Sequence, residues 1–321
     1  SLLAAVALVA ACGGDDDEPD TAMPDFGPNV IVVDPSMRVE DINTKLQALA
    51  ARSDGFDESR SEVYFMPGTY GSEAGRFDPA TATGHIDSPV GFMMTVQGLG
   101  AAPGDVTING NLRVGAFQVD ALGTFWRSLA NLTIVPIQAD EPAFTLRWNT
   151  SQASSLRRVH VAGHLDLSGG ISFGSYMANS QVEGELRYGS GWEADRNPPV
   201  TGGVEQGPAQ YLIRDGAVGS VVGRQVHMVL SGVAGAPAGA FAPGDKTTLV
   251  TTAVSRDAAF VYAEGQRFKV FVPAVARNTS AVHWGTAAGD GRSLPISDFF
   301  IAKPEHTAAT RVPAHVFRAP R

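Results

Sequence analysis

Hydrophobic positions near the start of the folded region recur at helical spacing. A short apolar run at residues 29–34 is typical of a strand, and the next stretch, residues 35–52, carries apolar residues three or four positions apart. These are Val39, Ile42, Leu46 and Leu49. Ser36 is available as an N-cap, and the acidic Glu40 and Asp41 lie in the expected first turn, where they favour a helix. The pattern predicts one amphipathic helix after a first strand.

From residue 62 onward the pattern changes to short β-type runs separated by Gly, Asn and Asp. The clearest runs are residues 62–66, 92–97, 105–109, 131–135, 156–161, 179–183 and 225–230. Several begin with a polar residue that is followed by apolar positions in alternation, as in Asn131-Leu132-Thr133-Ile134, Arg158-Val159-His160-Val161 and Arg214-Asp215-Gly216-Ala217-Val218. This alternation predicts strands with one buried face.

The strand-like runs recur at irregular intervals that favour a solenoid. Anchored on Leu132, Val159, Val182 and Val218, the intervals are about 27, 23 and 36 residues. Repeats in the twenties without intervening helices predict coils that each add strands to parallel stacks and differ in loop length. A β-sandwich is the alternative, and it would show turns about every 8–12 residues and cleaner alternation.

Composition narrows the class of protein. The chain has 321 residues, of which 44% are hydrophobic and 18% are charged, so an intrinsically disordered protein is excluded. The 36 glycines and 20 prolines favour turns over helices. The formal net charge of −9 leaves no basic stripe of the kind that binds nucleic acid. An all-β protein without a nucleic-acid partner is expected.

The chain opens with features of an exported bacterial lipoprotein. Residues 2–11 are apolar but about half as long as the ~20 residues that a membrane-spanning helix needs, which suits the core of an export signal. They end in Val9-Ala10-Ala11-Cys12, which resembles the bacterial lipobox, in which the cysteine receives lipid. Cys12 is the only cysteine, and its alternative role is a buried free thiol. We expect lipid attachment at Cys12, contact with the membrane through that lipid, and a place in the cell envelope or on the cell surface.

An acidic segment follows the cysteine. Residues 13–28 contain six acidic residues and no basic one. Consecutive aspartates repel one another and stay extended, so a flexible tether is expected here rather than a calcium site. The predicted organisation is a signal segment at 1–12, the acidic tether at 13–28, one parallel β domain at 29–310 and an irregular tail at 311–321.

A series of motifs resembles one group of secreted proteins. The predicted helix is followed by FMPGTYG, TVQGLGAAPGDVTINGNLRV, TFWRSLANLTIVP, SQASSLRRVHVAGHLDLSGG and HMVLSGVAGAP. This series is similar to bacterial right-handed parallel β-helix proteins of the pectin-lyase-like superfamily and, in plan, to double-β-helix β-1,3-glucanases. The resemblance runs from about Asn29 to about Thr310. It implies an all-β, right-handed parallel β-helix with an N-terminal amphipathic capping helix.

The last part of this region resembles a linker. Residues 293–310 are similar to the stretch that, in longer relatives, leads into a second capping helix and a second β-helix. The chain therefore looks like one half of a two-part plan. If such relatives place catalysis in the second half or between the halves, this chain lacks it.

One predicted loop offers the groups that glycoside hydrolysis requires. The reaction needs two carboxyl groups, one of them kept protonated by its surroundings. The loop at residues 191–197 supplies Glu193 and Asp195 as catalytic candidates, with Trp192 and Arg196 as substrate-binding candidates beside them. The alternative is an ordinary surface loop that its tryptophan anchors.

Arg214 and Asp215 form a second candidate cluster. The resemblance implies that residues 210–215 are an inward or groove-facing polar motif, with Asp215 as a catalytic candidate and Arg214 as a substrate-binding candidate. An ion pair between coils is the alternative.

Other kinds of chemistry are less favoured. His160, His164 and Asp166 suggest a metal, but Gly163 interrupts the strand and no third histidine or cysteine is near, so no metal site is predicted. Calcium-assisted lyases of the superfamily need a dense acidic cluster, whereas residues 105–111 fit a strand and an Asn-Gly turn. No cofactor is expected. Three tryptophans beside β runs are expected in the core or in coil stacking: Trp126, Trp148 and Trp284.

The sequence is compatible with two functions. The first is a cell-surface carbohydrate-active or glycan-binding lipoprotein that resembles β-1,3-glucan hydrolases and takes a polysaccharide as its partner. The second is a non-catalytic surface module with a structural or adhesive role. An uncovered C-terminal coil would expose strand edges and favour self-association or another partner there.

Overall fold

The computed structural model describes most of the predicted β domain. The residues that it describes are 23–52, 57–76, 83–114, 124–137, 144–150, 154–167, 173–188, 210–223, 228–238 and 247–299. They are mainly β-strand, with one α-helix, α1 (Val39–Ala50), so the all-β prediction is confirmed. No helix within these ranges has the length and apolar character needed to cross a bilayer.

The predicted helix is present, but its start differs from the expectation. Ile42, Leu46 and Leu49 are buried, as their spacing predicted. The N-cap position is Arg38, which makes no side-chain capping bond. Asp34 instead accepts a hydrogen bond from the Ser36 backbone N–H at 2.8 Å, which holds the chain in a turn ahead of the helix. The predicted Ser36 cap is therefore wrong.

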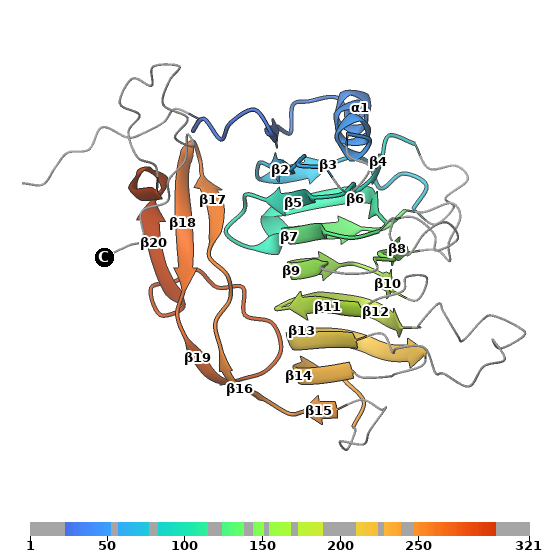
Figure 1. The fold of residues 1–321 in the computed structure, drawn as a ribbon, viewed down its shortest axis with the longest axis vertical. Helices are drawn as coiled ribbons and strands as arrows, with labels where there is room; N and C mark the ends of the chain where they lie inside the picture. The colour runs from blue at the N-terminus through green and yellow to red at the C-terminus, as the bar shows by residue number, and fades with distance from the viewer. Residues whose placement is uncertain are drawn as a thin grey trace, which may run out of the picture.

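Strands β1 to β15 pair in parallel, and successive passes of the chain lie one above another with α1 over one end (Figure 1). The strands and one short helical turn are β1 (Val30–Val33), β2 (Ser61–Phe65), β3 (Gly68–Tyr70), β4 (Ile86–Pro89), β5 (Met94–Gly98), η2 (Pro103–Asp105), β6 (Val106–Arg113), β7 (Arg127–Val135), β8 (Thr145–Arg147), β9 (Ser155–Val161), β10 (His164–Asp166), β11 (Phe173–Ala178), β12 (Gln181–Tyr188), β13 (Gln210–Gly223), β14 (Met228–Ala234) and β15 (Thr247–Leu249). A parallel pair needs a long crossover between its strands, and here the rest of each coil provides it.

The coils build three faces around the core. The first face contains five whole strands, β1, β2, β5, β11 and β15. It also contains the first halves of four longer strands, β7, β9, β13 and β14. The second face holds β3 with the first part of β6, the second halves of β7 and β9, the start of β12 and the middle of β13. The third face holds β4, β8 and β10 with the ends of β6, β12 and β13.

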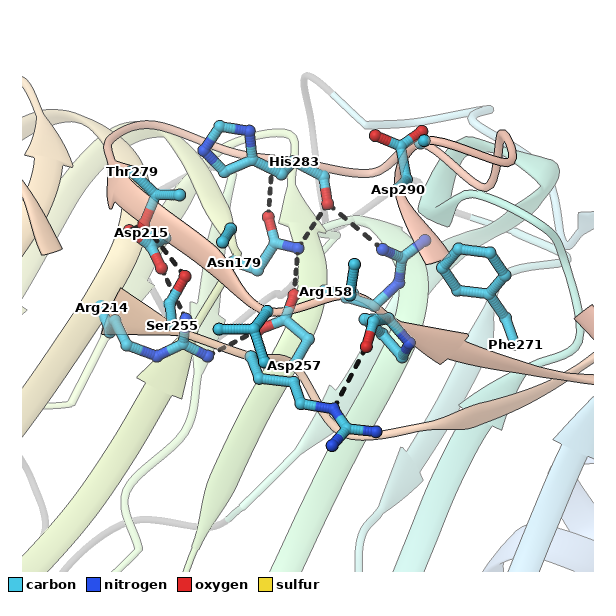
Figure 2. Close-up of a pocket in the computed structure, with 17 residues that line it drawn as sticks. Arg158, Asn179, Arg214, Asp215, Ser255, Asp257, Phe271, Thr279, His283 and Asp290 are labelled. Atoms are coloured by element: carbon cyan, nitrogen blue, oxygen red, sulfur yellow. Dashed lines mark hydrogen bonds and ion pairs between the residues drawn. The ribbon is translucent and has the colours of Figure 1, made fainter. Parts of the chain in front are cut away.

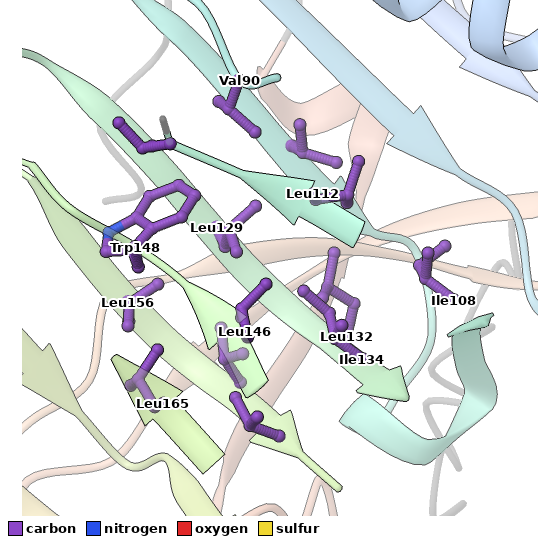
Figure 3. Close-up of a cluster of buried hydrophobic side chains, with 14 of the residues drawn as sticks. Val90, Ile108, Leu112, Leu129, Leu132, Ile134, Leu146, Trp148, Leu156 and Leu165 are labelled. Carbon is purple, nitrogen blue, oxygen red and sulfur yellow. The ribbon is translucent and has the colours of Figure 1, made fainter. Parts of the chain in front are cut away.

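Apolar side chains fill the space between the faces. One inward row of the first face stays in register from coil to coil: Val63, Val96, Leu129, Leu156, Met177, Ile213 and Leu230. Each of these side chains is at most 4% exposed. Neighbouring rungs lie about 4.8 Å apart, so the side chains stack directly on one another. Trp148 belongs to the same cluster, as expected (Figure 3).

Several strands bend sharply and join the first face to the second, and two of them, β9 and β13, share the same neighbours. β9 bends at Arg158 and β13 at Asp215, where φ is 54° and 49°. Their first halves pair with β11 and their second halves with β12, so the pairings close a ring of four strands, β9–β11–β13–β12.

The observed register corrects one of the predicted intervals. Leu132 pairs with Val159 and Val182 with Val218, as predicted, but Val182 pairs with Val161 rather than with Val159. The position opposite Val159 belongs to the buried Ser180, whose hydroxyl accepts the Val159 N–H and donates to the Ala178 carbonyl. The interval was misassigned because a hydroxyl with both bonds made can replace an apolar residue inside the stack.

Two further expectations are wrong. Asn109-Gly110 is not a turn but lies inside β6, where Gly110 has a φ of 140° and the strand passes from the second face to the third. A Cβ at Gly110 would meet the backbone of Ile86, so only glycine fits this bend. The predicted parallel region also does not continue to residue 310, because residues 252–299 pair antiparallel.

Residues 252–299, called here the C-terminal layer, run alongside the stack and across its coils (Figure 1). Their elements are β16 (Thr252–Ser255), β17 (Phe260–Glu264), β18 (Arg267–Pro273), β19 (Ala276–Thr279), β20 (Gly291–Pro295) and η4 (Ile296–Phe299). β16 pairs with β19, and β18 lies between β17 and β20. Phe268 and Val270 pack against Tyr64 and Leu99 on the outside of the first coils. The layer therefore covers part of the first face.

Candidate functional site

Of the predicted site residues, Arg214 and Asp215 lie in the described part of the chain, at the bend of β13. The predicted catalytic residues Glu193 and Asp195 and the predicted sugar-binding residues Trp192 and Arg196 lie outside the described residues, as does Cys12. The roles assigned to those five residues stay predictions. The geometry around Arg214 and Asp215 defines the candidate site.

One corner of the stack repeats the same unusual backbone conformation. The residues Asn131, Arg158, Asn179, Asp215 and Gly232 have φ values of 50°, 54°, 49°, 49° and 63°. Strand register aligns them in a single column, called here the corner column. A positive φ is uncommon outside glycine, and clusters of such residues favour a functional or architectural demand on the backbone. Here the side chains of Arg158, Asn179 and Asp215 point toward the C-terminal layer (Figure 2).

Arg214 connects the stack to the layer. Its Nε donates to the Tyr176 hydroxyl at 3.0 Å, and its two Nη atoms donate to Asp215 Oδ2 at 2.5 Å and to Asp257 Oδ1 at 2.6 Å. Burial alone would lower the pKa of Arg214, but hydrogen bonds and charge interactions with Tyr176 and Asp257 outweigh it and raise the pKa. Arg214 is therefore a permanent cation between two carboxylates.

Both carboxylate oxygens of Asp215 accept hydrogen bonds. Its side chain is 2% exposed, and while Oδ2 accepts from Arg214, Oδ1 accepts from the Thr279 hydroxyl at 2.8 Å. The Ser255 hydroxyl lies 3.0 Å from that of Thr279 and extends the chain of bonds into β16. A buried carboxylate with both oxygens bonded to donors has no exposed face for a substrate. This geometry favours the ion-pair interpretation of Asp215 over a catalytic one.

Arg158 makes the second cationic link. It is 4% exposed, and its Nε donates to Asn131 Oδ1 at 3.1 Å. Its Nη2 donates to the backbone carbonyls of Ala101 at 2.9 Å and Trp284 at 3.2 Å, and its Nη1 donates to that of His283 at 3.4 Å. The guanidinium lies 4.2 Å from the centre of the Phe260 ring. Burial lowers the pKa of Arg158 to about 10, so it is charged at neutral pH.

Asn179 ties the column to two segments of the layer. Its Oδ1 accepts the backbone N–H of His283 at 2.6 Å, and its Nδ2 donates to the His283 carbonyl at 2.6 Å and to Asp257 Oδ2 at 2.5 Å. Asp257 thus has one oxygen on Asn179 and the other on Arg214. The amide and the guanidinium together fix the position of this carboxylate.

A cavity of about 310 Å³ lies between the corner column and the C-terminal layer (Figure 2). Its wall is formed by the bonded side chains just described, and Arg256, His283 and Asp290 stand exposed at its edge. The volume is at the small end of the range for ligand pockets, about 300–1,000 Å³. The arrangement can bind a small polar group against a fixed wall. Two of the carboxyl groups that line it, those of Asp215 and Asp257, have both oxygens bonded within the network.

The two histidines considered as metal ligands point to different faces. His160 Nε2 lies 2.9 Å from Glu183 Oε1 on the second face, and His164 Nδ1 lies 3.9 Å from Glu185 Oε2 on the third. In the part of the chain that the structure describes, no three His, Cys, Asp or Glu side chains come together in a way that could hold a metal ion.

The half of the site that comes from the C-terminal layer was not predicted from the sequence. Asp257, Thr279 and the backbone at His283 are the partners of Arg214, Asp215 and Asn179. The polar residue at the start of each repeat was the available signal for the corner column. Nothing near residues 257, 279 or 283 repeats, so the pattern of the sequence gives no comparable signal for its partners.

The chain resembles a known protein along almost its whole length. No family model matches. An exo-beta-1,3-glucanase of Streptomyces sp. (strain SirexAA-E / ActE) is 36% identical over 322 aligned positions, which are 97% of this chain and 47% of that protein. The chain is similar to a β-1,3-glucanase. It spans about half the length of this curated relative.

Solved structures agree with the sequence similarity. The structure of sacteLam55A from Streptomyces sp. SirexAA-E superposes with a TM-score of 0.66 at 34% identity, over 88% of this chain and 46% of that one. A variant of the same protein in complex with glucose gives 0.65 at 35% identity, with the same coverage. The predicted resemblance to β-1,3-glucanases is supported.

Proposed function

We propose that the protein is carbohydrate-active and that its substrate is β-1,3-glucan. The observation that carries the proposal is the 36% identity to an exo-beta-1,3-glucanase along 97% of this chain. Further support comes from a solved relative that was determined with glucose bound. The chain spans about half of these relatives, so its own share of binding and of catalysis has to be measured.

The architecture that we propose is a right-handed parallel β-helix that α1 caps. Parallel pairing through three faces and rows of stacked apolar side chains support it. Right-handed crossovers between parallel strands are the strong general preference. A polysaccharide would then lie along the outer surface, where side chains of successive coils form rows.

The proposed catalytic groups belong to the loop at residues 191–197. Asp215 and Arg214 are already bonded within the network at the corner column, which leaves Glu193 and Asp195 as the proposed acid and base. Trp192 and Arg196 are proposed to hold the sugar. These roles rest on residue type and spacing.

The deciding experiment incubates the purified protein with laminarin and a panel of other polysaccharides. Release of reducing ends and retardation in a glycan-containing gel are scored together. We expect both signals with laminarin, and we expect Glu193→Gln and Asp195→Asn to abolish release. Glu58→Gln, at an exposed position, is the control. Retained activity in the two amide variants would remove the loop from consideration.

A second function is favoured by one specific observation. The only predicted catalytic group among the described residues, Asp215, is buried in an ion-pair network. We propose as the alternative a non-catalytic glycan-binding or adhesive module. Retardation by laminarin without release of reducing ends would identify it, and the absence of both signals would leave the carbohydrate proposal unsupported.

Attachment to a membrane is a separate proposal. The lipobox-like Val9-Ala10-Ala11-Cys12 supports lipidation of Cys12, and the acidic segment at 13–28 supports a tether between the lipid and the β domain at 29–310. Expression in a bacterial host with labelled palmitate should mark the wild-type protein but not Cys12→Ser. Equal labelling of the two proteins would contradict the proposal.

Association at the last coil is also proposed. Among the described residues β15 pairs with β14 alone, and Leu249 and Val250 beside it are 49% and 86% exposed. An open strand edge with apolar neighbours favours contact with another chain. Sedimentation of wild type and Val250→Lys across a range of concentrations tests this, and a monomer at all concentrations contradicts self-association.

A further inference from the structure

A group of side chains lies beside the corner column, where the C-terminal layer meets the second face. It consists of Trp284 from the layer and of His160, Gln181 and Glu183 from the second face. We propose that this group is a binding subsite for one neutral sugar ring of a β-linked glucan. The proposal rests on the proposed function for the identity of the glycan, and it adds where on this chain the glycan is held.

Trp284 supplies a fixed aromatic surface. Its indole Nε1 donates to the Asn179 carbonyl at 2.8 Å, and its own carbonyl accepts from Arg158 at 3.2 Å. The ring is half-buried, and its centre lies 5.8 Å from that of His160 at an interplanar angle of 44°. Because both bonds are made in the unliganded protein, binding does not need to order the ring, which lowers the entropic cost.

The polar side chains beside the ring have bonding capacity left. His160 Nε2 is 2.9 Å from Glu183 Oε1, and Glu183 is 52% exposed, so its other oxygen faces solvent. Gln181 lies opposite His160 in the parallel pairing of β9 with β12, and no described residue bonds its half-exposed amide. The carboxylate offers acceptors and the amide offers both donors and an acceptor.

This combination matches the chemistry of a β-linked glucose unit. Its hydroxyl groups project from the edge of the ring, and the two ring faces carry C–H groups and are apolar. A sugar of this kind needs an aromatic surface below it and hydrogen-bonding groups around its rim, the composition typical of small-ligand sites. The negative charge of Glu183 disfavours an anionic polysaccharide at this position. The ligand class is therefore a neutral glucan.

The side chains of this group lie on successive coils, an arrangement that suits a polymer. His160 and Gln181 belong to neighbouring coils, whose strands are about 4.8 Å apart along the stack. A chain that follows this row would run along the stack axis and would meet Trp284 at the edge of the layer. The subsite thus joins the stack and the C-terminal layer.

A second histidine and glutamate pair provides an internal control. His164 and Glu185 lie on the third face, and Glu185 accepts from Arg187 at 2.8 Å, so this carboxylate is already neutralised. Glu185→Gln therefore changes the same chemical group on the same strand, β12, outside the proposed subsite.

The test measures binding of laminarin by calorimetry and by the intrinsic fluorescence of tryptophan in the full chain. Glu183→Gln should weaken binding about fivefold, which is a typical effect of losing one hydrogen bond to a charged group that is partly exposed. Trp284→Leu should weaken it roughly tenfold and remove the fluorescence change. Glu185→Gln should stay within twofold of wild type. Carboxymethylated glucan should bind more weakly than laminarin.

Two outcomes separate this proposal from the proposed function. If the wild type binds laminarin and Glu183→Gln and Trp284→Leu bind it equally well, the subsite is wrong and the glucan function stands. If the wild type binds no β-1,3-glucan, the function is wrong and the subsite falls with it. Glu183→Gln keeps the test valid if Trp284→Leu folds poorly, because Glu183 is half-exposed and bonds one side chain.

Discussion

The parallel stack and the C-terminal layer are stabilised by different kinds of contact. Within the stack, rows of apolar side chains such as Val63, Val96 and Leu129 repeat from coil to coil and carry almost no exposed surface. Along the corner column, the layer is held by hydrogen bonds and ion pairs centred on Arg158, Asn179 and Arg214. Apolar burial is non-directional, whereas a satisfied polar network fixes one geometry. Stability thus resides mainly in the stack. Polar groups set the position of the layer along the corner column, and apolar contacts of Phe268 and Val270 add to its attachment over the first coils.

The largest effect is expected from a cavity in the stack. Leu129→Ala removes a side chain with no exposed surface, and we expect a loss of about 2–5 kcal/mol in the free energy of unfolding, since the neighbouring coils relax only partly. Urea unfolding monitored by circular dichroism measures it. Leu212→Ala, at a position that is 42% exposed, should cost less than about 0.5 kcal/mol. Equal losses in the two variants would contradict the assignment of stability to the interior rows.

A smaller and more local effect is expected at the corner column. Arg158→Ala leaves Asn131 Oδ1 and the carbonyls of Ala101 and Trp284 without their donor, which should cost roughly 3 kcal/mol. Hydrogen exchange should accelerate at residues 260–299 and stay slow in the first-face strands. Arg157→Ala is the matched control, because Arg157 is half-exposed and packs on Tyr176. Uniform acceleration throughout the chain would show that the layer and the stack unfold as one unit.

A smaller loss of stability is expected from a substitution at Asp257, which joins the layer to the corner column. Asp257→Asn keeps the shape of the side chain but removes the charge that Arg214 and Asn179 bind, so we expect a loss of about 1–2 kcal/mol. Differential scanning calorimetry measures the change. Asp290→Asn alters an exposed carboxylate at the edge of the same cavity and should leave the melting temperature within error. A larger effect at Asp290 than at Asp257 would overturn the assigned network.

The smallest effect concerns Glu62 on the outside of β2. Burial raises the pKa of Glu62 above its usual 4.5, although a hydrogen bond from Tyr64 lowers it in part. The folded state therefore binds this proton more tightly than the unfolded state, and stability falls as the pH rises from 4.5 through the raised pKa. Glu62→Gln removes that loss.

We expect Glu62→Gln to raise the melting temperature at pH 7 by about 1–2 °C. The difference should disappear below about pH 4, where the wild-type carboxyl is protonated in both states. Melting curves of the two proteins between pH 3.5 and pH 8 measure it, with Glu58→Gln as an exposed control. A constant difference across this range would show that the effect of the substitution is not one of proton binding.

Periodicity predicted the parts of the fold that repeat. The helix at residues 39–50 and the in-register apolar rows follow from local spacing, because each coil presents the same pattern to the same core. The predicted register was wrong at Ser180. This residue is polar in the sequence, but it takes an interior position because its buried hydroxyl makes two hydrogen bonds. Bends such as that at Gly110 were mistaken for turns for a related reason: a positive φ has the same residue preference in both.

Only the half of the candidate site that the stack contributes was predictable from the sequence. Arg214 and Asp215 were identified as a polar pair. The predicted alternative, an ion pair between coils, differs from the observed contacts, because Arg214 pairs with Asp215 on the same strand and with Asp257 of the layer. Their partners in the layer are distant: Asn179 bonds Asp257 and His283, which are 78 and 104 residues further along the chain. Contacts of this range depend on where an antiparallel segment folds back, and no local pattern encodes that.

The chemical order of the corner column has a consequence for assembly. From coil to coil the side chains read amide, guanidinium, amide, carboxylate and none, at Asn131, Arg158, Asn179, Asp215 and Gly232. Because this order is not uniform, a layer displaced by a single rung would bring Asp257 away from Arg214 and would set carbonyls against a carboxylate. Mismatched placements are penalised by repulsion and lost bonds, so five positions suffice to specify a single alignment between two otherwise repetitive surfaces.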